Sequence, residues 1–208
     1  MTEKIDFKET LDGYQAKVGR FRLIEIPVTR YLMIDGRGDP NTSPAYTQAL
    51  QALYPVAYAL KFASKRELGR DYVVPPLEGL WWAEDMSAFT AARDKSQWDW
   101  TMMLMVPGWI NEAMFHAATD VVAARGDVQR LADVRFETLS EGLCVQTLHI
   151  GSFDDEAEVL EEMHRTFIPG QGLSPSGKHH EIYFSDFRKV TADKLRTILR
   201  QPVAVATA

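Results

Sequence analysis

The stretch WDWTMMLMV, residues 98–106, carries the clearest signal for the fold. Side chains in a strand point alternately to its two faces. Trp100, Met102 and Leu104 would share one face, and Met103 and Met105 the other, so both faces are largely apolar. A strand of this kind has to be covered on both sides. The run therefore predicts a sheet with further layers packed against it.

The rest of the chain supplies the other strands and the helices. Strands are expected over residues 21–28, 31–35, 134–139, 143–150 and 179–186, with an extended segment over 73–84. Helices are expected over residues 45–65, 107–126, 154–168 and 191–200. We expect a kink or break at Pro55 in the first helix, because proline lacks the amide hydrogen. Residues 134–139 and 143–150 are predicted to pair as a hairpin.

A faint internal repeat indicates how these elements combine. A strand leads into Gly36-Arg37-Gly38-Asp39 and then a helix, and a second strand leads into Gly151-Ser152-Phe153-Asp154 and then a helix. Two such units need a shared sheet to bury their apolar faces. The sequence therefore predicts an α+β fold with an antiparallel sheet, helices on one side and a central ligand cleft where the halves meet.

One domain accounts for the whole pattern. Residues 1–20 are polar and are expected to be irregular, residues 21–203 to form the domain, and residues 204–208 to be a loose tail. Since only about 20 residues precede the first expected strand, we expect no separate DNA-binding module before it.

Composition narrows the classes of function. The net charge of −6 at pH 7, without a dense Lys/Arg block, argues against nucleic-acid binding. Cys144 is the only cysteine, which excludes an intrachain disulfide and fits a reducing compartment. The N-terminus lacks the apolar core of a secretory signal, and no run has the roughly 20 apolar residues of a membrane span. We expect a cytoplasmic location, no membrane partner and an oligomeric state that the sequence leaves open.

The strand HHEIYFSD, residues 179–186, carries the main candidates for chemistry. By alternation Glu181 and Tyr183 share one face, and Ile182 and Phe184 the other. If Ile182 and Phe184 pack under the helices, Glu181 and Tyr183 face the cleft. A glutamate among aromatic rings can act as a general base when desolvated, or as a counter-charge for a cationic ligand. The structural alternative is a glutamate on a solvated sheet face.

Aromatic residues and a second carboxylate are candidates for the wall of the cleft. Glu78 lies in PLEGLWW on the same face as Trp82, with Trp81 on the other face. Tyr54 and Tyr58 are four residues apart and share one side of a helix. Core packing remains the alternative for each aromatic residue. The candidate binding residues are Tyr31, Tyr54, Tyr58, Glu78, Trp81, Trp82, Trp100, His149 and His180.

The histidines do not predict a metal site. His179, His180 and Glu181 are adjacent, but a zinc signature would need further ligands such as a downstream cysteine pair, which the chain lacks. His149 and His180 are better explained as residues that hold strands or donate to a ligand. There is also no phosphate-binding or dinucleotide-binding glycine motif and no nucleophile elbow. We therefore expect no metal and no organic cofactor.

The segments YLMIDGRGDPN, PLEGLWW, WDWTMMLMVP, HIGSFDDE and HHEIYFSD resemble, in order and spacing, those of stand-alone GyrI-like small-molecule-binding proteins. More narrowly they resemble the branch known as cyclopropanoid cyclopropane hydrolases. The resemblance covers nearly the whole chain. It implies two strand–helix–strand–strand (SHS2-type) repeats around a groove that binds small aromatic or cationic organic molecules beside a buried glutamate.

The resemblance also implies an activity. An enzyme of this branch would detoxify DNA-alkylating compounds by adding water to their cyclopropane ring. Glu181 would then be the general base and Tyr183 the first candidate to donate to the developing oxyanion, ahead of His180, while Glu78 would orient the water or the base. The alternative is a multidrug-binding module that sequesters hydrophobic or cationic compounds without turnover. A protein-interaction domain acting on a large partner is suggested by the family name alone.

Overall fold

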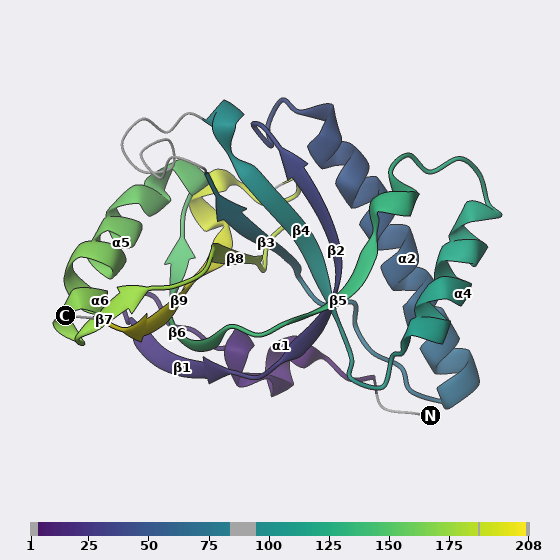
Figure 1. The fold of residues 1–208 in the computed structure, drawn as a ribbon, viewed down its shortest axis with the longest axis horizontal. Coiled ribbons are helices and arrows are strands. Elements are labelled where there is room, and N and C mark those ends of the chain that lie inside the picture. Colours follow the sequence, from purple (N-terminus) through teal and green to yellow (C-terminus); the bar gives the residue numbers. More distant parts are fainter. Residues whose placement is uncertain (1–3, 84–94, 187, 207–208) are drawn as a thin grey trace.

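A large antiparallel sheet runs through the molecule (Figure 1). The computed structural model describes residues 4–83, 95–186 and 188–206. The strands are β1 (Arg22–Ile26), β2 (Thr29–Arg37), β3 (Leu77–Trp82), β4 (Asp99–Val106), β5 (Arg135–Leu139), β6 (Gly142–Ile150), β7 (Leu173–Pro175), β8 (His179–Tyr183) and β9 (Arg196–Val205). They are arranged in the order β1-β6-β9-β8-β3-β4-β2-β5, and β7 pairs with β9.

The strand order shows that the expected internal repeat is structural. The succession strand, helix, strand, strand occurs as β2-α2-β3-β4 and again as β6-α5-β8-β9, with the short β7 inserted before β8. The sheet order reads symmetrically about the β3–β8 pair, where the two units meet. This confirms the α+β class with an antiparallel sheet and helices on one side.

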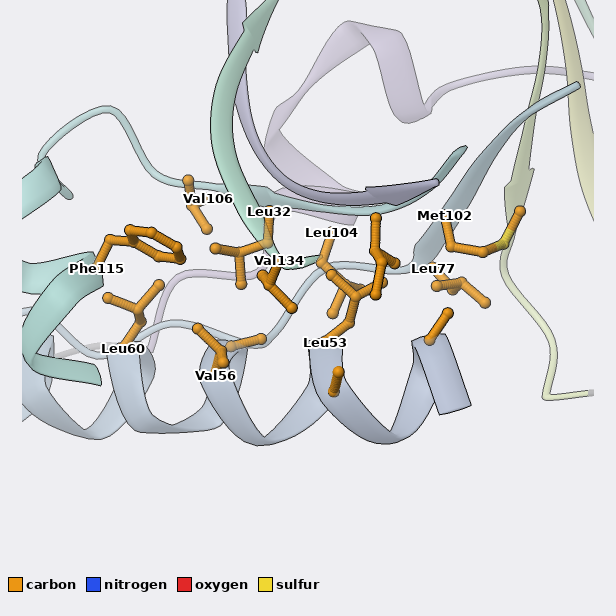
Figure 2. Close-up of a cluster of buried hydrophobic side chains, with 14 of the residues drawn as sticks. Leu32, Leu53, Val56, Leu60, Leu77, Met102, Leu104, Val106, Phe115 and Val134 are labelled. Carbon is orange, nitrogen blue, oxygen red and sulfur yellow. The ribbon is translucent and has the colours of Figure 1, made fainter. Parts of the chain in front are cut away.

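Apart from the short N-terminal helix α1 (Phe7–Thr10), the helices that pack on the sheet lie on one side of it. They are α2 (Pro44–Leu68) and α4 (Glu112–Ala123) at one end, and α5 (Glu156–Glu162), a π-helical turn (Met163–Phe167) and α6 (Ile168–Gly170) at the other (Figure 1). Leu53, Val56 and Leu60 of α2 pack on Leu32 and Leu104 of the sheet (Figure 2). Of the kink or break expected at Pro55, the break does not occur, because α2 continues through Pro55 and buries residues on both sides of it.

The two faces of the sheet hold different cores. The face covered by these helices, called here the helix face, includes Leu32, Met102 and Leu199. The opposite face includes Met33, Met103 and Ile198 and is covered by Phe7 and Tyr14 of the N-terminal segment, so we call it the N-terminal face. Both faces of β4 are buried, as its sequence predicted.

The prediction that residues 134–139 and 143–150 pair as a hairpin is wrong. β5 pairs with β2, and β6 pairs with β1 and β9. Only Pro27 and Val28 separate β1 from β2, and only Ser140 and Glu141 separate β5 from β6. The segment β1–β2 therefore pairs along its length with the segment β5–β6, and the two form a long bent two-stranded ribbon instead of a hairpin. Strand alternation identified both segments but says nothing about their partners.

The C-terminal helix expected over residues 191–200 is also wrong. A short 3₁₀ turn (Ala192–Lys194) leads into β9, which lies between β6 and β8 and is buried on both faces. Pairing in the centre of the sheet overrides the local helical pattern. The tail expected to be loose is strand up to Val205, because β7 pairs with Val203–Val205. Residues 207–208 of that tail lie outside the described residues.

The N-terminal segment is more ordered than the irregular structure expected for it. It forms α1 (Phe7–Thr10) and a 3₁₀ turn (Asp12–Tyr14), and it bridges to the domain at Tyr72 and Leu148. The ordering comes from burial of Tyr14 against the sheet. Residues 1–3 lie outside the described residues. No helix in the described part of the chain is long and apolar enough to cross a membrane.

Candidate functional site

A carboxylate set among aromatic side chains lies on the helix face, at the junction of the two repeats. The Tyr183 hydroxyl donates to Glu181 Oε2 at 2.7 Å and accepts from Trp81 Nε1 at 2.8 Å. Glu181 is only 8% exposed. Burial, and then the negative charge of Glu181, raise the pKa of Tyr183 well above its ordinary value, so the phenol keeps its proton. The three residues form a fixed chain of donors that ends on the carboxylate.

A glycine makes this arrangement possible. Gly79 pairs with Glu181 across the β3–β8 junction. A Cβ at Gly79 would lie 2.6 Å from Met102 Cε, 2.8 Å from Trp81 Nε1 and 3.2 Å from the Tyr183 hydroxyl oxygen. The indole and the phenol therefore occupy the space that a side chain at position 79 would need. The stretch PLEGLWW thus supplies both the Trp81 indole and, at Gly79, the space in which that indole bonds to Tyr183.

Further aromatic side chains surround these three. Phe153 meets the Tyr183 ring edge-on at 5.8 Å between centroids, and Trp98 meets Trp81 in the same way at 5.8 Å. The Tyr46 ring packs edge-on against Trp100 at 5.5 Å between centroids. Burial raises the pKa of Tyr46, and the charge of Glu181 raises it further. Phe153 comes from the second repeat and Tyr46 from α2, so both halves of the domain contribute to the site.

Two histidines complete the second-repeat side. His179 Nε2 lies 3.5 Å from Glu181 Oε1. The His164 ring, in the π-helical turn, lies 6.4 Å from the His179 ring between centroids. Burial, together with His179, lowers the pKa of His164 to about 4, so its ring is neutral at pH 7. π-Helical turns inside α-helices frequently occur at functional sites, and this one places His164 next to His179.

The alternation predicted for β8 is confirmed, but its orientation is the reverse of the one considered. Glu181 and Tyr183 lie on the helix face, while Ile182 packs in the core of the N-terminal face and Phe184 against that core. The candidate site therefore lies between the helices of the two repeats and not on the N-terminal face. The sequence could not decide this point, since both faces of β8 carry large apolar residues.

The second candidate carboxylate belongs to a separate buried network on the N-terminal face. Glu78 is 0% exposed and accepts hydrogen bonds from Tyr14 and Tyr31. Its Oε2 lies 2.9 Å from His180 Nε2, and His180 Nδ1 lies 2.9 Å from Glu141 Oε1. Arg200 closes the network through Glu141 Oε2 at 3.0 Å. The expectation that Glu78 orients water or base beside Glu181 is wrong, because the sheet separates the two carboxylates.

Carboxylate and basic side chains alternate along this network. Burial alone would lower the pKa of His180, but the charge of Glu141 and hydrogen bonds to Glu141 and Glu78 raise it overall. Burial of Glu141 acts the other way, and the cations His180 and Arg200 hold its pKa at about 2. Buried charges in close pairs specify one arrangement more than they add stability. The role of His180 is structural here, and it does not face the candidate site.

The other predicted residues are spread over both faces. Tyr31 lies on the N-terminal face beside Glu78, and Trp82 carries Lys178 Nζ 3.1 Å above its ring. Trp100 is fully buried on the helix face and packs edge-on against Tyr46. His149 is on the helix face but bonds to the Ser152 carbonyl oxygen. Tyr54 and Tyr58 lie on α2, with Tyr58 exposed.

The described residues include no cluster of His, Cys, Asp and Glu arranged to hold a metal ion. Two hollows are formed elsewhere. One of about 740 Å³ is lined by Arg30, Asn111 and Phe136, and one of about 300 Å³ by Leu80, Glu141 and Lys178.

Comparison with known proteins matches this geometry to a family. The model of the GyrI-like small molecule binding domain matches residues 20–204. The chain belongs to the GyrI-like family. Its members are small-molecule-binding domains, so the site between the two repeats is a candidate binding site for a small molecule. No curated protein matches the chain.

Several solved structures are similar to this chain. An uncharacterized conserved protein from Listeria innocua is 39% identical, with a TM-score of 0.87 over 97% of this chain and 100% of that one. A hydrolase from Listeria innocua is 38% identical, with a TM-score of 0.86 over the same shares. The C-terminal domain of EcmrR shares the fold alone, at 11% identity and a TM-score of 0.55 over 90% of this chain and 98% of that one.

The sequence analysis did not predict several residues of this candidate site. Tyr46, Trp98, Phe153 and His164 were not among the candidates, and His179 was considered only as a metal ligand. Tyr46 could have been found, because it lies eight residues before Tyr54 and hence on a neighbouring part of the same helix surface. Phe153 and His164 offered no such signal, since their positions depend on how the second repeat folds against the first.

Proposed function

We propose that this protein is a cofactor-independent hydrolase that opens the cyclopropane ring of flat, aromatic, DNA-alkylating compounds by adding water, with Glu181 as general base. One observation carries the proposal. Glu181 is almost fully buried among aromatic rings, and its orientation is fixed by the Tyr183 hydroxyl. A carboxylate held in this way is withdrawn from bulk water, which strengthens its electrostatic interactions and favours proton abstraction.

The proposed step adds one water molecule. Glu181 takes a proton from water, and the water oxygen forms a bond to a methylene carbon of the strained ring. The carbon–carbon bond of the ring breaks, and its electron pair moves into the conjugated dienone, whose oxygen becomes a phenolate. That oxygen is then protonated, and Glu181 returns its proton to solvent. Because the strain energy lies in the substrate, positioning and one base suffice.

The geometry divides the roles between two tyrosines. The Tyr183 proton is directed at Glu181, which makes Tyr183 a positioning residue for the base in place of the oxyanion donor first expected. Tyr46 is a second phenol on the same face of the sheet, packed against Trp100, and its raised pKa keeps it protonated. We assign to Tyr46 the hydrogen bond to the oxygen that becomes negative as the ring opens.

Relatives support hydrolysis as the reaction class. Two structures from Listeria innocua at 36% and 38% identity, each covered over its whole length, carry the description hydrolase. The narrower resemblance to cyclopropanoid cyclopropane hydrolases supplies the substrate class. Detoxification would be the biological outcome, in the cytoplasm, where such compounds reach DNA.

The experiment is incubation of the protein with a spirocyclopropane alkylating compound in heavy-oxygen water, followed by mass spectrometry. The proposal predicts repeated turnover and a ring-opened product with one heavy oxygen. Glu181→Gln should bind the compound but turn it over at least about a hundredfold more slowly, which is within the usual range for loss of a general base. Glu158→Gln, an exposed change on α5, is the matched control and should retain activity.

A binding module without turnover is the second candidate, favoured by the same buried carboxylate, which can serve as counter-charge for a cation among aromatic rings. Stoichiometric binding without product, with cation preference lost in Glu181→Gln, would identify the protein as a sequestering module and overturn the hydrolase proposal.

A further inference from the structure

Glu181 has to lose a proton after each turnover, and the direct way out is narrow. Glu181 is only 8% exposed, and Trp81 on the neighbouring strand is buried as well. A flat ligand seated over the carboxylate would cover what remains of that opening. A base that stays protonated cannot activate the next water molecule. The site therefore needs a route for protons that does not lead past the bound ligand.

The two carboxylate oxygens of Glu181 have different neighbours. Oε2 accepts the hydrogen bond from the Tyr183 hydroxyl at 2.7 Å, and Oε1 lies 3.5 Å from His179 Nε2. A hydrogen bond to an ionised oxygen stabilises its charge and makes that oxygen less basic. The proton taken from water is therefore expected on Oε1, on the side of His179. His179 is 4% exposed, so it meets the carboxylate but does not reach solvent itself.

A second imidazole continues from His179 toward the surface. His164 lies in the π-helical turn Met163–Phe167, and its ring centroid is 6.4 Å from that of His179, with 57° between the ring planes. His164 is half-buried, and Arg165, the next residue of the turn, is exposed and paired with exposed Glu161. One water molecule can bridge polar atoms across a gap of this size. His164 thus links buried His179 to solvent.

The chemistry of the two rings suits proton transfer. A neutral imidazole can accept a proton at one nitrogen and release the proton of the other nitrogen. Burial, and then the neighbouring His179, lower the pKa of His164 to about 4. The His164 ring is therefore neutral at pH 7 and readily releases to water any proton that it accepts. A ring that stayed charged would hold the proton and repel the next one.

We propose that His179 and His164 form a proton relay that returns Glu181 to its ionised state after each turnover. The proton passes from Glu181 Oε1 to His179 Nε2, and His179 releases its Nδ1 proton through water to His164. His164 releases a proton to solvent, and exchange with water restores the first tautomer of each ring. Both histidines act through Glu181, since neither has to touch the reacting carbon. The inference rests on the proposed function, because it requires that Glu181 is protonated in every cycle.

The test compares the first ring opening with later ones. With protein in excess over a spirocyclopropane compound, Glu181 starts ionised, so a single turnover does not need the relay. With the compound in excess, every later turnover does. His164→Ala and His179→Gln interrupt the relay at its two members, and His116→Ala, at an exposed histidine on α4, is the matched control. Rates are measured at constant pH and ionic strength in a dilute, bulky buffer, with and without added imidazole as a small proton carrier.

The relay predicts a burst in both relay variants. The first turnover should stay within about twofold of the wild-type rate, and the steady-state rate should then fall at least about tenfold. Imidazole should restore the steady-state rate of His164→Ala, because that position is open to solvent. His116→Ala should match the wild type in both phases.

Several outcomes overturn the relay. They are an unchanged steady-state rate in His164→Ala, an equal loss in its first and later turnovers, and a burst that imidazole does not relieve, which would indicate slow product release. Ring opening by the wild type is the separate measure of the proposed function. Its absence refutes that function together with the relay, whereas its presence with any of these outcomes refutes the relay alone.

Discussion

Tyr183 holds Glu181 from a position two residues along the same strand, with 2.7 Å between its hydroxyl oxygen and Oε2. The two side chains point to the same face, and the Trp81 indole from the neighbouring strand fixes the phenol in turn. The carboxylate is therefore positioned by its own sheet and does not depend on a loop. Sites built on strands are held more closely than sites built on loops.

Tyr183→Phe should separate positioning from binding. It removes the donor to Glu181 and leaves the buried Trp81 N–H without its acceptor, at a cost of about 1 to 3 kcal/mol in the free energy of unfolding. We expect kcat to fall at least about tenfold with little change in KM, since ligand contacts remain. Steady-state kinetics and denaturant unfolding measure the two effects. An unchanged kcat would show that the hydroxyl does not position the base.

Gly79→Ala should disrupt the site by displacing the side chains packed over Gly79. Its methyl group would overlap Met102 and the Trp81 nitrogen, so the indole and phenol must shift. We expect loss of stability of about 1 to 3 kcal/mol and reduced ligand affinity. Gly108→Ala is the control, because a Cβ there meets nothing within 4 Å. Ligand titration of both variants checks this, and equal affinity in Gly79→Ala and the wild type would contradict it.

Glu78→Gln should affect stability and spare activity. It removes one buried charge that partners His180, and breaking such a pair costs about 3 kcal/mol. Because Glu78 lies across the sheet from Glu181, turnover per folded molecule should stay within about twofold of wild type. Thermal unfolding and activity of the folded fraction are the measurements. A hundredfold loss of kcat with normal stability would restore Glu78 to the catalytic site.

Stability should fall as the pH rises above about 6.5, the unperturbed histidine pKa. The pKa of His180 is raised in the folded state, so the native protein binds this proton more tightly than the unfolded chain does. That contribution is complete below pH 6.5 and is lost as the pH passes through the folded-state pKa. The pKa of His164 is lowered to about 4, so the unfolded chain binds this proton more tightly. His164 therefore reduces stability as the pH falls below 6.5.

Denaturant unfolding between pH 6 and 9 measures how steeply the free energy of unfolding falls as the pH rises. In His180→Gln the fall over that range should shrink, whereas the exposed His116→Gln should leave it unchanged. If stability fell with pH in His180→Gln as much as in the wild type, the pH dependence would come from a group other than His180.

The sequence predicted the elements of the core better than their partners. Alternation along β4 and β8 fixed which residues share a face, and the repeated Gly36 and Gly151 turns indicated the two units. The pairing of β5 with β2 and the strand at Arg196–Val205 depend on contacts distant in sequence, which local patterns do not encode. Alternation correctly grouped Glu181 with Tyr183, but it could not show that Glu78 lies on the other side of the sheet.

The most direct test of the central claim is the number of ring-opened product molecules formed per protein molecule from a spirocyclopropane compound, for the wild type and Glu181→Gln side by side. We predict many turnovers for the wild type and, for the variant, a rate lower by at least about a hundredfold with binding intact. Equal rates in the two proteins, or no more than one product per protein molecule in the wild type, would contradict Glu181 as a catalytic base.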